Sequence, residues 1–312
     1  LAHVNRLPLL LLPGETFASR RPDPVLQQVE DFNEPGITAN DCFRPVTRLW
    51  DRIVRPEQLI TSLPQAMSVL TDPADCGPVV LALPEDVLTG TAQVADARQW
   101  QRVESAPSPA SLTQLSEMLR EAQRPFLIVG NSGWSEAACN DLRRFVETQQ
   151  IPVGCEFRSQ DLFDNAHPCY AGDVGIGINP KLAQRIKESD LLIVLGGRLG
   201  EITTSGYELI AGPVPTQKLV HIYPDAEELG RFYLADLMIS ATMTVMAETL
   251  ARLPRLTREQ SATHAASANS DYREWQARKE IPGKVQMWDV IQHLDRVLPP
   301  DVIVTNGAGN YA

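Results

Sequence analysis

The chain has 312 residues, of which 43% are hydrophobic and 21% are charged, as is typical of a globular protein. At the usual domain size this length corresponds to about two domains. The formal net charge of −11 argues against nucleic acid as a partner, because binding to a phosphate backbone requires a basic face. No apolar run approaches the ~20 residues of a membrane span and no signal peptide is recognisable, so we expect a cytoplasmic protein without a membrane partner.

Residues 1–90 form the first expected block. An apolar run over residues 7–12, closed by a Pro-Gly pair, predicts a buried strand. Pro56 and Pro64 stand where the first turns of helices are expected. A second buried strand is predicted over residues 79–83.

Residues 91–107 lack clear periodicity and predict a linker. Residues 108–254 then alternate between strand and helix patterns, with continuous apolar strands that indicate a parallel sheet covered on both faces. Ligands of such sheets bind beyond the carboxyl ends of the strands. The strands predicted in this block are 126–129, 151–157, 191–195, 219–223 and 237–240.

Residues 255–283 are polar and poorly periodic, and we expect a long connection there. A helix and then a buried strand over 302–304 are predicted in residues 284–312. The strand runs into a Gly-rich turn that normally opens a helix, and the apolar run at 7–12 has no preceding sheet partner. We therefore expect the sequence to be a piece of a longer protein.

Three glycine-containing segments, over residues 172–177, 196–198 and 306–310, are candidate ligand sites. The loop over residues 172–177, with Gly175 and Gly177, is either a structural turn or a cofactor-facing loop, because glycines let backbone N–H groups approach a phosphate. It lacks the dinucleotide-binding fingerprint. The two glycines and two asparagines over residues 306–310 suit close approach to a diphosphate, although many ordinary turns have this composition.

Charged residues follow two of the predicted strands. Arg198 comes after the most apolar strand and is either a contact for a phosphate or carboxylate, or a solvated side chain. Asp225 could accept a hydrogen bond from a ribose hydroxyl or begin a helix. The five cysteines are widely spaced and the five histidines form no paired motif, so neither a disulfide framework nor a histidine metal site is expected.

The three-block layout resembles the thiamine-diphosphate enzymes of the acetolactate synthase superfamily. Residues 77–87 look like the closing strand of the pyrimidine-binding domain, and residues 189–198 look like the central domain. Residues 301–312 look like the first strand and loop of the diphosphate-binding domain.

The resemblance also divides along the chain. Residues 1–76, through the segments 16–28 and 40–46, are most similar to the trihydroxycyclohexane-dione hydrolases of inositol catabolism. Residues 77–312 are most similar to an acetolactate-synthase-like group, through segments such as 197–207.

The resemblance implies an α/β fold in which parallel sheets carry helices on both faces. A central doubly wound, Rossmann-like domain is flanked by partial thiamine-diphosphate-binding domains. The implied organisation is the C-terminal part of a pyrimidine-binding domain over 1–90, a linker over 91–107, the central domain over 108–254, a connection over 255–283 and the start of a diphosphate-binding domain over 284–312.

The resemblance further implies thiamine diphosphate and Mg²⁺ as cofactors and a homodimer or homotetramer. The catalytic glutamate is implied before Leu1 and the Mg²⁺ ligands after Ala312, so the sequence names no catalytic or metal residue and the chain alone is expected to be inactive. Gly307, Gly309 and Asn310 match the segment that meets the diphosphate.

Acetolactate synthases that bind FAD carry an acidic pair after the strand-end arginine. Here Leu199-Gly200-Glu201 stands in its place, which argues against FAD. Gly175, Gly177 and Arg198 remain candidate cofactor-binding residues.

The implied reaction is transferase or lyase chemistry on a C–C bond beside the carbonyl of a small 2-keto acid. The first alternative is hydrolytic ring opening of trihydroxycyclohexane-1,2-dione. The second is a nucleotide-binding module that uses the central sheet without catalysis.

Overall fold

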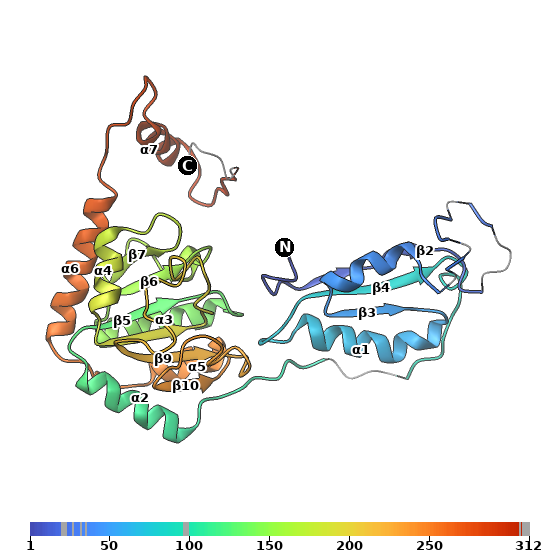
Figure 1. Ribbon diagram of the computed structural model, residues 1–312, viewed down its shortest axis with the longest axis horizontal. Coiled ribbons are helices and arrows are strands. Elements are labelled where there is room, and N and C mark those ends of the chain that lie inside the picture. The colour runs from blue at the N-terminus through green and yellow to red at the C-terminus, as the bar shows by residue number, and fades with distance from the viewer. Residues whose placement is uncertain are drawn as a thin grey trace.

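The computed structural model describes residues 1–19, 24–26, 28–31, 33–34, 36–95, 100–305 and 307. This part of the chain forms two separate parallel sheets, one near the N-terminus and one in the middle (Figure 1). Both sheets carry helices, so the α/β class predicted from the sequence is confirmed.

The N-terminal sheet is built around β4 (Pro78–Pro84). Its residues Val79–Leu81 are fully buried, because a continuous apolar strand packs on both faces. The strands β1 (Leu9–Leu11) and β2 (Gly14–Glu15) pair with successive parts of β4, and β3 (Leu49–Arg52) also pairs with it. The accompanying helical segments are η1 (Ala39–Val46), η2 (Pro56–Gln58) and α1 (Leu59–Leu70).

Two expectations for this region need correction. The strand at residues 7–12 forms, but Leu9 is 47% exposed, because β4 is the one described strand that β1 pairs with. Pro64 lies inside α1 instead of in its first turn. Pro56 does occupy the start of a helical segment, as predicted.

The central sheet has six parallel strands in the order β10-β9-β8-β5-β6-β7. The chain starts at β5, moves outward to β7, then returns to β8 beside β5 and moves outward to β10. This is the doubly wound order, and it reverses direction between β5 and β8. The strands are β5 (Pro125–Val129), β6 (Val153–Glu156), β7 (Tyr170–Val174), β8 (Leu191–Leu195), β9 (Lys218–Tyr223) and β10 (Leu237–Ser240).

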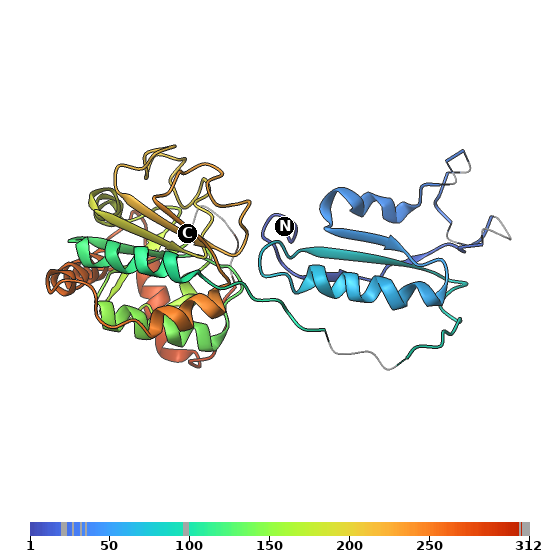
Figure 2. The ribbon, with the colours of Figure 1, turned by 90° about the horizontal axis from the view of Figure 1, so that it is seen from below.

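Helices cover both faces of the central sheet (Figures 1 and 2). On one face, side chains such as Leu127 and Ile193 pack against α2 (Pro109–Glu121), α3 (Glu136–Gln149) and α5 (Met243–Ala251). On the other face, Phe126 and Leu192 pack against α4 (Pro180–Glu188). Alternate residues of each strand thus face opposite helix layers.

Three elements differ from the sequence prediction. The strand β7 was not predicted, and the expected connection contains the helix α6 (Gln260–Trp275), which packs beside β7 and α4. The helix α7 (Met287–Val297) forms, but residues 302–304 are exposed and form no strand.

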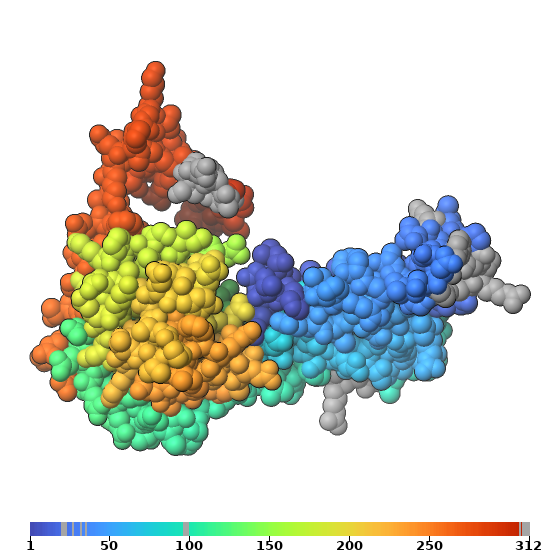
Figure 3. Space-filling view, in the orientation of Figure 1, coloured from blue at the N-terminus to red at the C-terminus, as the bar shows by residue number. Residues whose placement is uncertain are grey.

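The two sheets belong to bodies that lie side by side, with residues 1–6 between them (Figure 3). Residues 91–95 and 100–107 have no regular secondary structure, and a linker over residues 91–107 stays a prediction. Within the described ranges, we find no helix long and apolar enough to cross a membrane.

Candidate functional site

The candidate site lies at the carboxyl ends of β5 and β8, where the direction of the central sheet reverses. Doubly wound sheets form a crevice at this point. Gly130 follows β5, and Gly196 and Gly197 follow β8. A Cβ added at Gly130 would lie 2.4 Å from the Cα of Gly197, so glycine is required where these two turns meet.

Glu156 ends the adjacent strand β6 and points toward these glycines. A Cβ at Gly197 would lie 2.4 Å from Oε1 of Glu156, so the glycine makes room for the carboxylate. Oε1 is buried and has no hydrogen-bond partner among the described residues. Burial raises the pKa of the Glu156 carboxyl above its ordinary value, while hydrogen bonds from Thr203 and the backbone of Leu199 oppose the shift.

His221, in β9, fixes the turn after β8. Its Nε2 donates a hydrogen bond of 2.8 Å to the carbonyl oxygen of Gly197. Burial lowers the pKa of the imidazole, and the contact with Gly197 offsets part of that shift. The buried ring therefore acts as a neutral support for the turn that presents Arg198.

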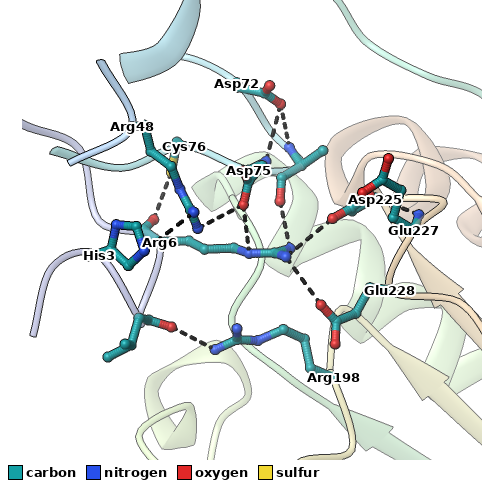
Figure 4. Close-up of polar contacts among 12 residues, drawn as sticks. His3, Arg6, Arg48, Asp72, Asp75, Cys76, Arg198, Asp225, Glu227 and Glu228 are labelled. Carbon is teal, nitrogen blue, oxygen red and sulfur yellow. Dashed lines mark hydrogen bonds and ion pairs between the residues drawn. The ribbon is translucent and has the colours of Figure 1, made fainter. Parts of the chain in front are cut away.

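Arg6, from the N-terminal body, reaches this edge of the central sheet (Figure 4). Its Nη2 lies 3.1 Å from Oδ2 of Asp225 and 3.1 Å from Oε2 of Glu228. Its Nη1 donates to the hydroxyl of Tyr223 at 2.9 Å and to the carbonyl oxygen of Ala74 at 2.7 Å. A planar guanidinium can serve several acceptors at once, and here it joins the two bodies.

The same contact extends back into the N-terminal body (Figure 4). Nε of Arg6 lies 3.2 Å from Oδ1 of Asp75, and Nη2 of Arg48 lies 2.9 Å from the same oxygen. The backbone of Arg6 has a φ of 53°, in the left-handed region that costs a residue with a Cβ about 1–2 kcal/mol. The side-chain contacts of Arg6 offset this cost. We call Arg6, Asp75, Asp225 and Glu228 the Arg6 cluster.

Arg198, which the sequence nominates for a phosphate or carboxylate, lies close to this cluster. Its Nη2 donates a hydrogen bond of 3.1 Å to the carbonyl oxygen of Val4 (Figure 4). Asp225 does not begin a helix. Its Oδ1 accepts from the backbone N–H of Glu227 in a turn, while its Oδ2 accepts from Arg6.

Arg198 and Asp225 are thus both held by residues of the N-terminal body. A nucleotide such as FAD would have to displace Arg6 from Asp225 before its ribose could bind there. The residues present at this edge therefore do not fit FAD as long as Arg6 contacts Asp225 and Glu228.

A cavity of about 740 Å³ opens beside the cluster. It combines acidic and basic groups, since Glu156, Glu228, Arg198 and Arg231 all line it. Its aromatic wall contains Tyr207, Phe232 and Tyr233, whose rings contact one another.

The other nominated residues lie elsewhere. Gly175 follows β7 and lies against Phe157 and Asp173, close to the end of β6. Gly177 lines a different cavity of about 600 Å³, together with Tyr272 and Trp275 of α6. The loop over 172–177 thus begins inside a strand, contrary to the sequence interpretation.

Gly307 is exposed and distant in sequence from both cavities, and neither cavity includes it in its lining. Gly309 and Asn310 lie outside the described residues. The assignments of Gly175, Gly177, Arg198, Gly307, Gly309 and Asn310 to a cofactor remain predictions.

Sequence reasoning missed Arg6, Glu156 and Glu228. The sequence does contain a signal for Glu156, because a carboxylate at the end of an apolar strand is unusual in a buried parallel sheet. The sequence contains no such signal for Arg6, because its partner Asp225 is 219 positions away in the sequence.

Comparison with known proteins shows what the central part of the chain is similar to. Residues 112–253 match the family model described as the central domain of thiamine pyrophosphate enzymes. These residues also form the doubly wound sheet, so this part of the chain is similar in sequence to the central domain of thiamine pyrophosphate enzymes.

Two curated relatives show which enzymes the chain is similar to. Over 213 residues the chain is 41% identical to 3D-(3,5/4)-trihydroxycyclohexane-1,2-dione hydrolase of Bacillus cereus (strain AH820), a match that covers 67% of this chain and 33% of the relative. The hydrolase of that name from Bacillus thuringiensis (strain Al Hakam) is 40% identical over 212 residues, with the same coverage of 67% and 33%. The chain thus spans about one third of the length of these relatives.

A solved structure agrees in fold. A protein isolated from Mycobacterium smegmatis, described as a thiamin diphosphate-dependent enzyme, superposes with a TM-score of 0.62 and 20% identity. The superposition covers 83% of this chain and 48% of that chain.

Proposed function

We propose that this chain serves in a thiamine-diphosphate-dependent enzyme that acts on a C–C bond beside a carbonyl group. The central-domain match over residues 112–253 carries this proposal. When bound, the cofactor supplies the nucleophilic carbon and the electron sink for such reactions. The protein supplies orientation and electrostatics.

Gly307, followed by Gly309 and Asn310, would hold the diphosphate. Among the described residues, no atom lies within 4 Å of a Cβ added at Gly307, so these residues leave room there for a large anionic group. Among the residues the structure describes, no cluster of three or more His, Cys, Asp or Glu could hold a metal ion. Mg²⁺ is proposed from the family resemblance.

The finer proposal concerns the substrate. The relatives that share 41% identity are named for trihydroxycyclohexane-1,2-dione, and we propose hydrolytic ring opening of a hydroxylated cyclic diketone. The competing reaction, synthesis of acetolactate from a 2-keto acid, is supported by the resemblance of residues 77–312. We further propose a cytoplasmic homodimer or homotetramer.

In this proposal the Arg6 cluster orients the two bodies. Residues 4–6 lead directly into β1 of the N-terminal sheet, and they are fixed on the central sheet through Arg6 and the carbonyl oxygen of Val4. The cluster thereby sets the position of the N-terminal strand edges relative to the central domain.

Substrate turnover tests the finer proposal. The complete gene product that contains this chain would be incubated with thiamine diphosphate and Mg²⁺, in parallel with the cyclic diketone and with pyruvate. We expect the diketone to be opened to an acid, which a pH-stat detects. Conversion of pyruvate to acetolactate with no reaction of the diketone would contradict the finer proposal and leave the cofactor assignment intact.

A further inference from the structure

A buried ion pair lies at the carboxyl ends of the N-terminal strands, away from the Arg6 cluster. Glu15 ends β2 and pairs with Pro84, while Arg52 ends β3 and pairs with Ala82 on the opposite side of β4. Because Pro84 and Ala82 are two residues apart, the side chains of Glu15 and Arg52 project from the same face of the sheet. They meet across β4.

This pair is incompletely satisfied. Nε of Arg52 donates to Oε2 of Glu15 at 2.7 Å. The Glu15 side chain is 1% exposed and that of Arg52 is 20% exposed. Even so, Oε1 of Glu15 and Nη2 of Arg52 are both buried and have no hydrogen-bond partner among the described residues. Buried charged groups are costly unless their remaining hydrogen bonds are made.

The two open positions define the chemistry of the group that would complete them. Oε1 of Glu15 accepts a hydrogen bond and Nη2 of Arg52 donates one. A carboxylate ligand would be repelled by Glu15, and an ammonium group by Arg52. A neutral hydroxyl satisfies both, because its O–H donates to Glu15 while its oxygen accepts from Arg52.

The surroundings fit a hydroxylated ring. Glu15 and Thr16 line a cavity of about 390 Å³, whose apolar wall includes Leu83 and Leu88, while Arg52 lies outside this lining. The Thr16 hydroxyl oxygen is also buried and has no partner among the described residues, so it offers a further hydroxyl contact. The cavity opens at the carboxyl ends of parallel strands, where ligands of such sheets bind.

From this arrangement we infer that Glu15, held by its ion pair with Arg52, binds a hydroxyl group of a neutral, polyhydroxylated ring in this cavity and selects for such substrates. The choice of a ring substrate rests on the proposed function. The hydroxyl chemistry rests on the two unpartnered atoms alone. Glu15 is therefore a specificity-determining residue, and Arg52 positions its carboxylate.

Calorimetric titration of the chain with myo-inositol, without thiamine diphosphate, tests the inference. We expect saturable binding, and at least tenfold weaker binding after Glu15→Gln, because a hydrogen bond to a charged group is replaced by one to a neutral amide. Glu57→Gln is the matched control: it makes the same chemical change on an exposed residue outside the cavity lining and leaves the affinity unchanged. Cyclohexanone, which has no hydroxyl, is expected to give no heat.

If Glu15→Gln does not fold, Thr16→Val provides a second variant of nearly equal volume, for which we expect several-fold weaker binding. No heat with myo-inositol on the folded wild-type chain would overturn the inference, since the two atoms would then be completed by water only. Equal affinity in wild type and both cavity variants would also overturn it. Because the titration contains no cofactor, either result leaves the cofactor assignment standing, and failure of cofactor binding leaves the hydroxyl site standing.

Discussion

Removal of the Arg6 side chain is expected to uncouple the N-terminal body from the central domain. Arg6→Ala leaves Glu228, whose side chain is 9% exposed, without its closest cation. It also removes Arg6 from Asp225, which is 18% exposed, and from Asp75, which is 44% exposed and keeps its ion pair with Arg48.

The magnitude follows from these exposures. Breaking a fully buried pair costs about 3–5 kcal/mol, and an exposed pair contributes at most about 1 kcal/mol. Asp75 belongs to the exposed class, and the two contacts on the central domain are partly buried. We therefore expect Arg6→Ala to lower the free energy of unfolding by about 3 kcal/mol.

Urea unfolding followed by circular dichroism measures this loss, and hydrogen exchange of residues 1–12 shows whether it is local. The matched control is Arg231→Ala. It removes another arginine from the same Glu228, but this arginine is 72% exposed and lies 3.4 Å away, so a change below about 1 kcal/mol is expected. A double-mutant cycle with Glu228→Gln should give a coupling energy above about 1 kcal/mol for Arg6. Coupling no larger than that of Arg231 would refute the reasoning.

Three further predictions concern the central sheet. Gly197→Ala places a Cβ 2.4 Å from Oε1 of Glu156 and should lower the free energy of unfolding in urea by about 1–3 kcal/mol. Gly200→Ala should be nearly neutral, because no described atom lies within 4 Å of the added Cβ, and equal effects of the two changes would contradict the packing argument. Burial raises the pKa of the Glu156 carboxyl above 4.5, so the stability that its protonated form contributes is lost as the pH rises. Glutamine stays neutral, so Glu156→Gln should become more stable relative to wild type as the pH rises from 4.5 to neutrality. A difference in the free energy of unfolding between variant and wild type that does not change with pH would contradict this. Asp190 accepts hydrogen bonds from the backbone N–H groups of Gln123 and Arg124 at 2.8 and 2.9 Å. Asp190→Ala should therefore lower the free energy of unfolding by about 1–2 kcal/mol and lower the melting temperature. An unchanged melting temperature would show that water replaces the carboxylate.

The success of sequence reasoning depended on how much apolar signal an element carries. β5, β8 and β9 were predicted correctly, because their buried positions are filled by large apolar residues. β7 was missed because Gly172 and Asp173 interrupt its pattern. α6 was missed because small or polar residues, such as Ser261 and Ala265, occupy its buried face.

The strand predicted over residues 302–304 shows the opposite error. Its residues are β-branched and apolar, but they pair with none of the described strands. A strand is stabilised by its neighbours, so local composition alone cannot establish it.

The position of the candidate site could be predicted from the sequence, but its side-chain contacts could not. The carboxyl edge of the central sheet, with Arg198 and Asp225, followed from strand–helix alternation. Which groups those side chains contact could not be inferred, because Arg6 and Val4 belong to the other body.

Cofactor binding is the decisive test of whether this chain serves in a thiamine-diphosphate-dependent enzyme. Thiamine diphosphate and Mg²⁺ would be titrated by calorimetry into the complete gene product that contains this chain, with circular dichroism to verify that it is folded. We expect saturable binding heat that disappears when the metal is chelated. A folded protein that gives no heat at saturating cofactor would contradict it.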